Sequence, residues 1–190
     1  MVSRVKKIWQ HKKGKWAIFG AVIVLLFMLP VRCEGPYRGR VVTQENGKPL
    51  SGVVVVGSWT YIIPNVGGGT TRCVDADEVL TDENGEFEIS GRWIPPLRPR
   101  GSMDIHIYKV GYRGVECSWE YLTREGSCYA NKPVEFDGGR AVFPFEKMSM
   151  DELNWQGSPP SVGCGRKDGK PLTAWRSERE KYYEALEKKH

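Results

Sequence analysis

The sequence predicts a mainly β protein that has an apolar segment near its N-terminus and an amphipathic helix at its C-terminus. Short runs of β-branched residues recur between Asn-Gly turns, a pattern typical of strands. The 22 glycines and 12 prolines interrupt the chain too often for a helical bundle, and a hydrophobic fraction of 40% is too high for a disordered chain. The 190 residues suffice for one domain and a short extra segment.

The N-terminal segment has the pattern of an export signal. An uncharged apolar run, residues 17–29, follows a basic stretch, residues 1–15. The sixteen residues from Trp16 to Val31 would form about 24 Å of helix, which is marginal for a bilayer core about 30 Å thick. The positive-inside rule places the basic stretch in the cytoplasm and exports the rest. We therefore predict a signal anchor or signal peptide over residues 16–32, with an inner-membrane anchored, periplasmic or extracytoplasmic domain beyond it.

Three fates of this segment are open: retention as an anchor, cleavage, and lipidation at Cys33. Signal peptidase prefers small residues at the end of the run, where this chain has Leu29-Pro-Val-Arg32. A lipobox likewise has a small residue directly before its cysteine, and Arg32 stands there. The sequence therefore favours the uncleaved anchor, with a secreted protein and a lipoprotein as the alternatives.

The charge distribution argues against a nucleic-acid partner. The formal net charge is +5, but residues 1–32 hold seven cations and no acid. The remainder has 28 − 7 = 21 basic against 23 acidic residues, a net charge of −2. Binding to phosphates needs clustered Lys and Arg in the folded part, so we predict no nucleic-acid partner.

All five cysteines follow the apolar run and so lie in an oxidising compartment under this topology. Four of them predict two disulfides, with Cys117–Cys128 weakly favoured and all three pairings open; the candidates are Cys73, Cys117, Cys128 and Cys164. The odd one, Cys33, is the lipidation candidate. No C-x-x-C pair occurs and the three histidines are scattered, so we predict no metal site and no cofactor.

The first strands follow directly from the hydrophobic pattern. Residues 39–44 are predicted as a strand, followed by a turn at residues 45–48. Residues 50–63 form a long second strand. Its centre, Val53–Val56, is apolar on both faces, so we expect it in the middle of a sheet. Residues 63–73 contain three successive glycines and are interpreted as a flexible loop.

Further strands bring the total to about seven, which is typical of a β-sandwich. Residues 78–81 and 86–90 flank Asp82-Glu-Asn-Gly85, which is predicted as a hairpin turn. The remaining strands are expected at residues 103–108, 115–122 and 141–145.

Four motifs carry a family resemblance. They are Gly39-Arg-Val-Val, Gly47-Lys-Pro-Leu-Ser-Gly-Val-Val-Val, Thr81-Asp-Glu-Asn-Gly-Glu-Phe-Glu-Ile and Ile105-His-Ile-Tyr-Lys-Val-Gly-Tyr112. In order and spacing, residues 37–115 resemble a carboxypeptidase regulatory-like domain. The resemblance implies a seven-stranded transthyretin-like Greek-key sandwich over residues 37–147. Domains of that family are accessory, folding-support or ligand-contact modules and are generally not catalytic, so the resemblance implies a binding or accessory function.

The last segment, residues 148–190, is expected to be a loop followed by one amphipathic helix over residues 172–189. The apolar stripe of this helix either docks on the sandwich or forms a face for a partner. The candidate residues for a partner face are Trp175, Tyr182, Tyr183 and Leu186.

Together these observations predict a non-catalytic envelope protein whose exported β-sandwich acts as a binding or accessory module for another protein. The alternatives are a carbohydrate-binding module, an immunity-type periplasmic inhibitor of a partner protein and, remotely, a small hydrolase. An exposed aromatic row across one sheet would favour a sugar ligand. A hydrolase would need a pocket that holds His106 with a second titratable group. His106 shares the outward face of its strand with Asp104 and Tyr108, which is interpreted as a surface arrangement.

Overall fold

A computed structural model describes residues 32–94, 101–128, 132–149, 152 and 158–188. The predicted basic stretch and the predicted anchor, up to residue 31, lie outside the described residues. Within the described part, no helix has the length and apolar character needed to cross a membrane. The chain divides into two compact units. The first includes residues 32–34 and 93–94, where β1 (Arg32–Glu34) forms a two-stranded sheet with β6 (Arg92–Ile94); Arg92, the first residue of β6, belongs to the second unit.

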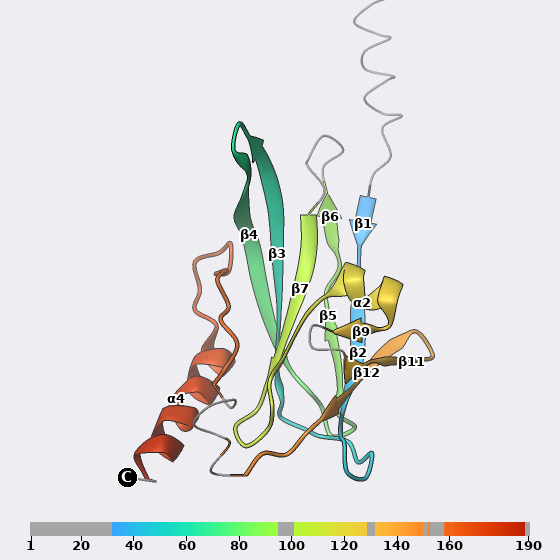
Figure 1. The fold of residues 1–190 in the computed structure, drawn as a ribbon, viewed down its shortest axis with the longest axis vertical. Helices are drawn as coiled ribbons and strands as arrows, with labels where there is room; N and C mark the ends of the chain where they lie inside the picture. The colour runs from blue at the N-terminus through green and yellow to red at the C-terminus, as the bar shows by residue number, and fades with distance from the viewer. Residues whose placement is uncertain (1–31, 95–100, 129–131, 150–151, 153–157, 189–190) are drawn as a thin grey trace, which may run out of the picture. The chain divides into compact units, whose positions relative to one another are not determined.

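The second unit is built on two four-stranded sheets (Figure 1). The first sheet has the order β11-β12-β2-β5 and consists of β11 (Glu135–Asp137), β12 (Arg140–Phe145), β2 (Tyr37–Thr43) and β5 (Glu86–Ile89). The second has the order β4-β3-β7-β8 and consists of β4 (Gly68–Leu80), β3 (Val54–Asn65), β7 (Gly101–Tyr108) and β8 (Val115–Ser118). All neighbouring strands are antiparallel except β12 and β2, which are parallel.

The inner faces of the two sheets share one hydrophobic core. Val41, Ile89 and Phe143 of the first sheet pack in the same buried cluster as Val55 and Ile107 of the second. Removing each such side chain from water contributes about 1.5–3 kcal/mol, so this shared core is the main source of stability. The mainly β fold predicted from the strand pattern is confirmed.

The four consecutive valines, Val53–Val56, are buried because the second sheet is covered on both faces. Val53 and Val55 face the shared core, whereas Val54 and Val56 belong to a second buried cluster on the outer face. Helix α4 (Thr173–Glu187) supplies Trp175 and Tyr182 to that second cluster. The expected C-terminal helix is therefore present, and the outer layer explains the continuous apolar run.

Polar contacts from the sheet hold α4 in place. The Glu78 carboxylate on β4 accepts hydrogen bonds from the backbone N–H groups of Thr173 (2.6 Å) and Trp175 (3.0 Å), which satisfies free donors of the first helical turn. Further along the helix, the carboxylate of Glu178 accepts a hydrogen bond from the backbone N–H of Val110 (2.8 Å). The helix is thus bound to the sheet by charge-assisted hydrogen bonds as well as by apolar packing.

Two sequence predictions are wrong about which strands pair: a predicted loop is part of a hairpin, and a predicted hairpin turn joins two sheets. Residues 63–73 form no flexible loop: they complete the β3–β4 hairpin, whose turn is at Val66 and Gly67. The turn at residues 82–85 joins β4 to β5, which belong to different sheets, so it is not a hairpin turn. Gly69 suits the hairpin because a Cβ there would lie 2.5 Å from Cγ2 of Ile62.

A third correction concerns the strand predicted over residues 115–122. The strand ends at Ser118, and α2 (Trp119–Glu125) follows directly. Gly126 ends this helix with a φ of 64°, a left-handed conformation that favours glycine. Beyond it, β9 (Ser127–Cys128) pairs with β10 (Lys132–Pro133).

The cysteines form the two disulfides that the sequence predicted. Cys117 bonds Cys128, the favoured pairing, and this disulfide brackets α2. Cys73 bonds Cys164, which links β4 to the segment before α4. Cys33 is free and exposed.

Candidate functional site

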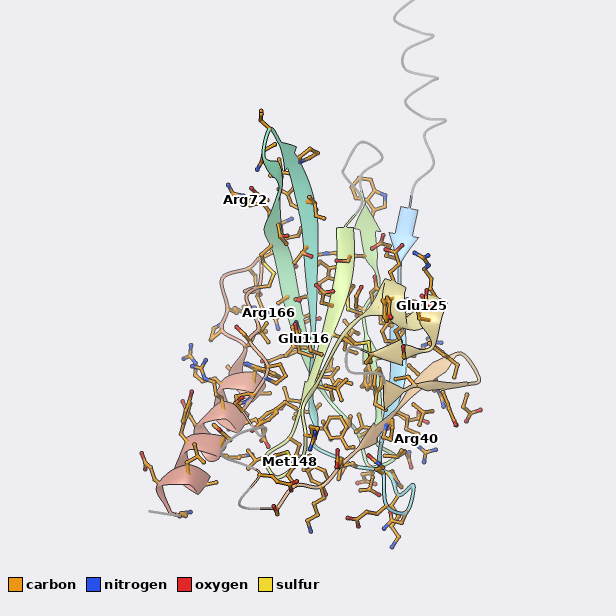
Figure 2. The ribbon with its side chains drawn as sticks, viewed as in Figure 1. Arg40, Arg72, Glu116, Glu125, Met148 and Arg166 are labelled. Atoms are coloured by element: carbon orange, nitrogen blue, oxygen red, sulfur yellow. A yellow bond between two sulfur atoms is a disulfide. The ribbon has the colours of Figure 1, made fainter. Side chains whose placement is uncertain are left out.

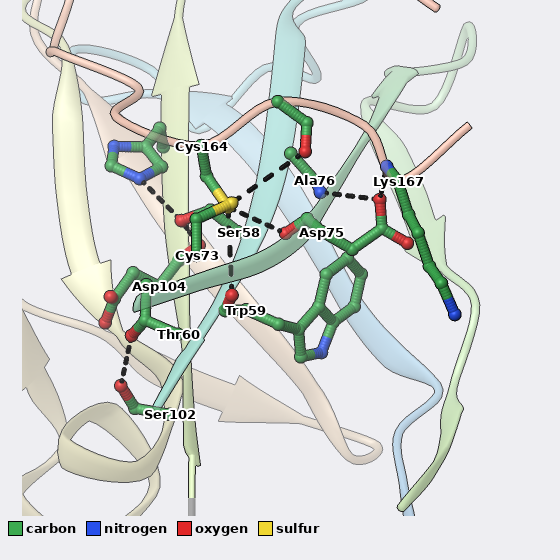
Figure 3. The surroundings of a disulfide bond; sticks show 12 residues. Ser58, Trp59, Thr60, Cys73, Asp75, Ala76, Ser102, Asp104, Cys164 and Lys167 are labelled. Atoms are coloured by element: carbon green, nitrogen blue, oxygen red, sulfur yellow. Dashed lines mark hydrogen bonds between the residues drawn. A yellow bond between two sulfur atoms is a disulfide. The ribbon is translucent and has the colours of Figure 1, made fainter. Parts of the chain in front are cut away.

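A cavity of about 500 Å³ opens beside the Cys73–Cys164 disulfide. Its lining comes from three segments, namely the paired strands β3 and β4, the residues after β5, and the segment before α4. The lining residues are Trp59, Asp75, Ala76, Asp77, Ser90, Gly91, Arg92, Arg166, Lys167 and Asp168. Figure 3 shows Trp59, Asp75 and Lys167 around the disulfide. All of these residues belong to the second unit.

An irregularity in the β3–β4 pairing shapes one wall of the cavity. Trp59 pairs with Asp75 and Thr60 pairs with Cys73, so Val74 has no partner on β3. An unmatched residue of this kind is a β-bulge, which bends a strand and redirects the side chains beside it. The bulge separates Cys73, whose sulfur bonds the C-terminal segment, from Asp75, whose carboxylate faces the cavity.

Asp75 connects the three segments that line the cavity. Its Oδ1 accepts hydrogen bonds from the backbone N–H groups of Ala76 (2.9 Å) and Lys167, and its Oδ2 pairs with Nη2 of Arg92. The Asp75 side chain is only 17% exposed, so these contacts are shielded from water more than a surface ion pair is. Asp75 is therefore occupied in holding the wall and the floor of the cavity together.

The floor of the cavity consists of Trp59 and Arg92. The guanidinium carbon of Arg92 lies 4.9 Å from the centroid of the Trp59 ring, a cation–π arrangement. Trp59 is only 7% exposed, and its indole Nε1 has no hydrogen-bond partner among the described residues. The same holds for Nη1 of Arg92. A buried N–H donor without an acceptor costs about 1–3 kcal/mol, so these two donors destabilise this part of the protein.

The rim carries balanced charges. Arg166 lies between two carboxylates, with Nη1 3.1 Å from Oδ1 of Asp77 and Nε 3.3 Å from Oδ1 of Asp168. A hydrogen bond from the backbone N–H of Lys170 lowers the pKa of Asp168, and Arg166 contributes to the same shift. In the described part of the chain, no group of three His, Cys, Asp or Glu residues is arranged to hold a metal ion. The rim therefore presents both signs of charge to polar groups of a ligand.

His106 lies away from this cavity, in contact with a serine. Its Nε2 is 3.2 Å from Oγ of Ser58, and both residues are only 4% exposed. The predicted outward face is correct, but the interpretation as a surface arrangement is wrong because the Cys164 segment and α4 cover that face. Burial lowers the pKa of His106, an effect that the nearby Glu116 carboxylate opposes. Burial raises the pKa of Asp104. Ser58 and His106 thus form a buried polar pair that does not line the cavity.

The residues of the predicted partner face have different environments. Trp175 and Tyr182 are buried against this chain's own sheet, and the ring of Trp175 contacts that of Tyr108 at 5.9 Å. Leu186 is half-buried in the same cluster, whereas Tyr183 is 54% exposed. Three of the four residues therefore pack the helix against this chain's own sheet, as one of the two alternatives predicted, and only Tyr183 is exposed.

The exposed aromatic side chains of the described residues do not form a row across one sheet. The exposed aromatic residues lie on four different elements: Trp93 on β6, Tyr121 on α2, Phe136 on β11 and Tyr183 on α4. The feature that would favour a sugar ligand is not seen in the described part of the chain.

The cavity was not predicted from the sequence, although one signal points to it. Asp75 follows Cys73 by two residues, and Arg166 follows Cys164 by two. The Cys73–Cys164 bond brings the two segments together, and both polar residues line the cavity. The missing information was the pairing, because four cysteines allow three connectivities.

Comparisons of the chain with protein-family models, with curated proteins and with solved structures found no match. The resemblance to a carboxypeptidase regulatory-like domain therefore rests on the four sequence motifs.

Proposed function

We propose that this protein is an exported, non-catalytic binding module, held at a membrane by residues 16–32, whose sandwich binds another protein in the cell envelope. The cavity beside the Cys73–Cys164 disulfide is the single observation that carries the proposal. We also propose that the sandwich is of the transthyretin-like, carboxypeptidase regulatory-like type. Support for that fold comes from the four motifs and from two sheets that share a core.

The composition of the cavity favours a polypeptide ligand. Tryptophan and arginine are the residue types that most often dominate binding energy at protein interfaces, and the floor consists of one of each. The guanidinium of Arg166 and the backbone of Lys167 lie at the cavity beside the carboxylates of Asp77 and Asp168, so donors and acceptors are both present for the backbone of an inserted loop. The mixed charges of the rim suit the polar groups that surround such a loop.

Export is supported by two independent features. A basic stretch precedes an apolar run in the sequence, as in export signals. The two disulfides lie beyond that run, and disulfides persist in oxidising compartments outside the cytoplasm. The membrane attachment itself is inferred from the length and composition of residues 16–32.

The test is site-specific photocrosslinking of the full-length protein in its native membranes. A photoreactive phenylalanine analogue replaces Ser90, an exposed residue of the cavity lining, or Ser51, an exposed residue outside it. We expect one discrete crosslinked protein from position 90 and none from position 51.

Matched arginine variants then separate the cavity from general surface charge. Arg166→Ala removes an arginine of the rim, and Arg140→Ala removes an ion-paired arginine of the other sheet. The crosslink from position 90 should be lost in the first variant and kept in the second. Equal crosslinking from positions 90 and 51, or equal loss in both arginine variants, would refute the cavity as the binding site.

A further inference from the structure

The β3–β4 hairpin continues beyond its sheet as a two-stranded arm, defined here as residues 62–71. β7 pairs with β3 only as far as Tyr61, which lies opposite Gly101. From Ile62 onward, β3 pairs only with β4 among the described strands, and Figure 1 shows this hairpin extending past the end of β7. Near the turn, Nδ2 of Asn65 donates a hydrogen bond to Oγ1 of Thr70 (2.9 Å). The arm is therefore a defined projection.

The arm carries three exposed apolar side chains. Ile62 is 59% exposed, Ile63 is 38% exposed, and Val66 at the turn is fully exposed. These three residues, within five positions, are three of the eight exposed large hydrophobic side chains in the described part of the chain. Because successive side chains of a strand point to opposite faces, Ile62 and Ile63 make both faces of the arm apolar, and exposed apolar side chains of this kind mark an interaction site.

The charge of the arm favours one kind of partner. Residues 60–72 contain no aspartate or glutamate, and their one basic residue is Arg72. Figure 2 shows Arg72 on the β4 strand of this hairpin, and Arg72 pairs with Tyr61 at the base of the arm. An apolar tip with a cation behind it is the arrangement that binds the interface of an anionic bilayer.

The chain enters the sandwich at the end from which the arm projects. β2 begins at Tyr37, whose ring centroid lies 6.2 Å from that of Trp59. Arg32 precedes Tyr37 by five positions, and at about 3.5 Å per position this stretch spans at most about 18 Å. From Trp59 to Val66 the strand advances seven residues, about 23 Å at about 3.3 Å per residue. The arm is therefore longer than the fully extended chain between Tyr37 and Arg32.

We propose that the tip of the arm inserts into the interface of the same membrane that holds the chain, an inference that rests on the proposed membrane attachment through residues 16–32. The depth of insertion is limited because the outer edges of a two-stranded hairpin carry unpaired backbone groups, which hydrocarbon cannot satisfy. The side chain of Val66 therefore enters to about 5–10 Å, the depth of other interfacial apolar faces, and Ile62 and Ile63, about 10–13 Å behind it along the strand, lie at the level of the headgroups. Arg72 contacts the phosphates of the headgroups.

The test uses the full-length protein reconstituted into vesicles of phosphatidylcholine and phosphatidylglycerol with brominated acyl chains. The fluorescent amino acid dansylalanine replaces Val66, or replaces Glu45 in the exposed turn after β2 as the matched control. We expect emission from position 66 to shift to shorter wavelength, to be quenched by the brominated chains and to be protected from aqueous iodide. Emission from position 45 should show none of these effects.

A second variant tests the neighbouring side chains. Ile62→Thr together with Ile63→Thr keeps the β-branched shape but adds hydroxyl groups, and it should reduce quenching at position 66. Flotation of the vesicles distinguishes two failures. If the protein does not float with the vesicles, the membrane attachment is wrong and this inference falls with it. If it floats but position 66 stays open to iodide, or shifts without quenching by the brominated chains, the attachment stands and the arm does not enter the bilayer.

Discussion

Removal of the Cys73–Cys164 disulfide should destabilise the protein more than removal of Cys117–Cys128. A disulfide restricts the unfolded chain, and the effect grows with the length of the loop that it closes. The first bond joins residues 91 positions apart and the second joins residues 11 positions apart. Loop entropy then gives about 4.6 kcal/mol for the longer loop and about 2.8 kcal/mol for the shorter one.

The assay compares two double alanine variants of the full-length protein in a mild detergent. Alanine avoids placing a hydroxyl group at Cys117 or Cys128, which are almost fully buried. Guanidinium unfolding followed by tryptophan fluorescence should show a free energy of unfolding lower by about 4.6 kcal/mol in Cys73→Ala/Cys164→Ala. A protein of this size loses about 2–4 °C of melting temperature per kcal/mol, so the shift should be about 9–18 °C.

The comparison between the two variants decides the outcome. Because both remove one disulfide, differences in redox treatment and detergent cancel. If the variant without Cys73–Cys164 loses no more stability than the variant without Cys117–Cys128, restriction of the unfolded chain does not account for the role of the longer bond. Local packing around the bond would then have to explain its contribution.

Three further predictions follow from single side chains. Glu78→Ala should lower the free energy of unfolding by about 1.5–3 kcal/mol, because the carboxylate accepts backbone hydrogen bonds at the start of α4. The control Glu88→Ala, which removes an exposed ion pair, should change it by under about 1 kcal/mol. Equal losses of stability for the two variants in urea titrations would contradict this. Burial lowers the pKa of His106 in the folded protein, so the unfolded chain takes up the proton at a higher pH than the folded one. The wild type should therefore lose stability as pH falls below about 6.5. His106→Gln should flatten this pH dependence. An unchanged slope between pH 7.5 and 5 would exclude His106 as its source. Gly39→Ala should lower the free energy of unfolding by about 1–3 kcal/mol, because the new Cβ would lie 2.4 Å from Cζ of Phe87. A melting temperature equal to that of the wild type would contradict this close contact.

Strand positions could be predicted from the sequence where one face of a strand is buried. The predicted strands at residues 39–44, 103–108 and 141–145 match β2, β7 and β12 closely, because their apolar residues alternate or face a shared core. The strand predicted over residues 115–122 is correct only as far as Ser118, where β8 ends. Its apolar pattern continues into α2, where Leu122 is buried as a helical residue, and periodicity over so few residues does not separate the two cases.

The long-range contacts could not be predicted, because they depend on pairings between distant segments. The turn at residues 82–85 has a hairpin sequence but joins two sheets, since β5 pairs with β2 instead of β4. Glu78 looks like one more charge in an acidic stretch, yet it caps a helix 95 residues away. The cavity likewise needs the Cys73–Cys164 bond, whose partners the sequence leaves open.

The C-terminal segment is therefore part of the binding site that we propose, because it supplies Arg166 and Lys167 to the cavity. The segment before α4 is held on the second sheet by the Cys73–Cys164 disulfide, the Arg166–Asp77 ion pair and the hydrogen bond from the Lys167 N–H to Asp75. The helix itself is held by the cap at Glu78 and by the buried side chains of Trp175 and Tyr182. An ion pair of this kind contributes at most about 1 kcal/mol, so the disulfide is the main restraint on the segment that carries Arg166. Reduction of the disulfide should then leave α4 docked while this segment moves. Crosslinking from position 90 should fall after reduction although the circular dichroism of the helix is retained. If crosslinking survives reduction unchanged, the polar contacts of Arg166 and Lys167 suffice to hold the segment, and the disulfide serves stability without shaping the site.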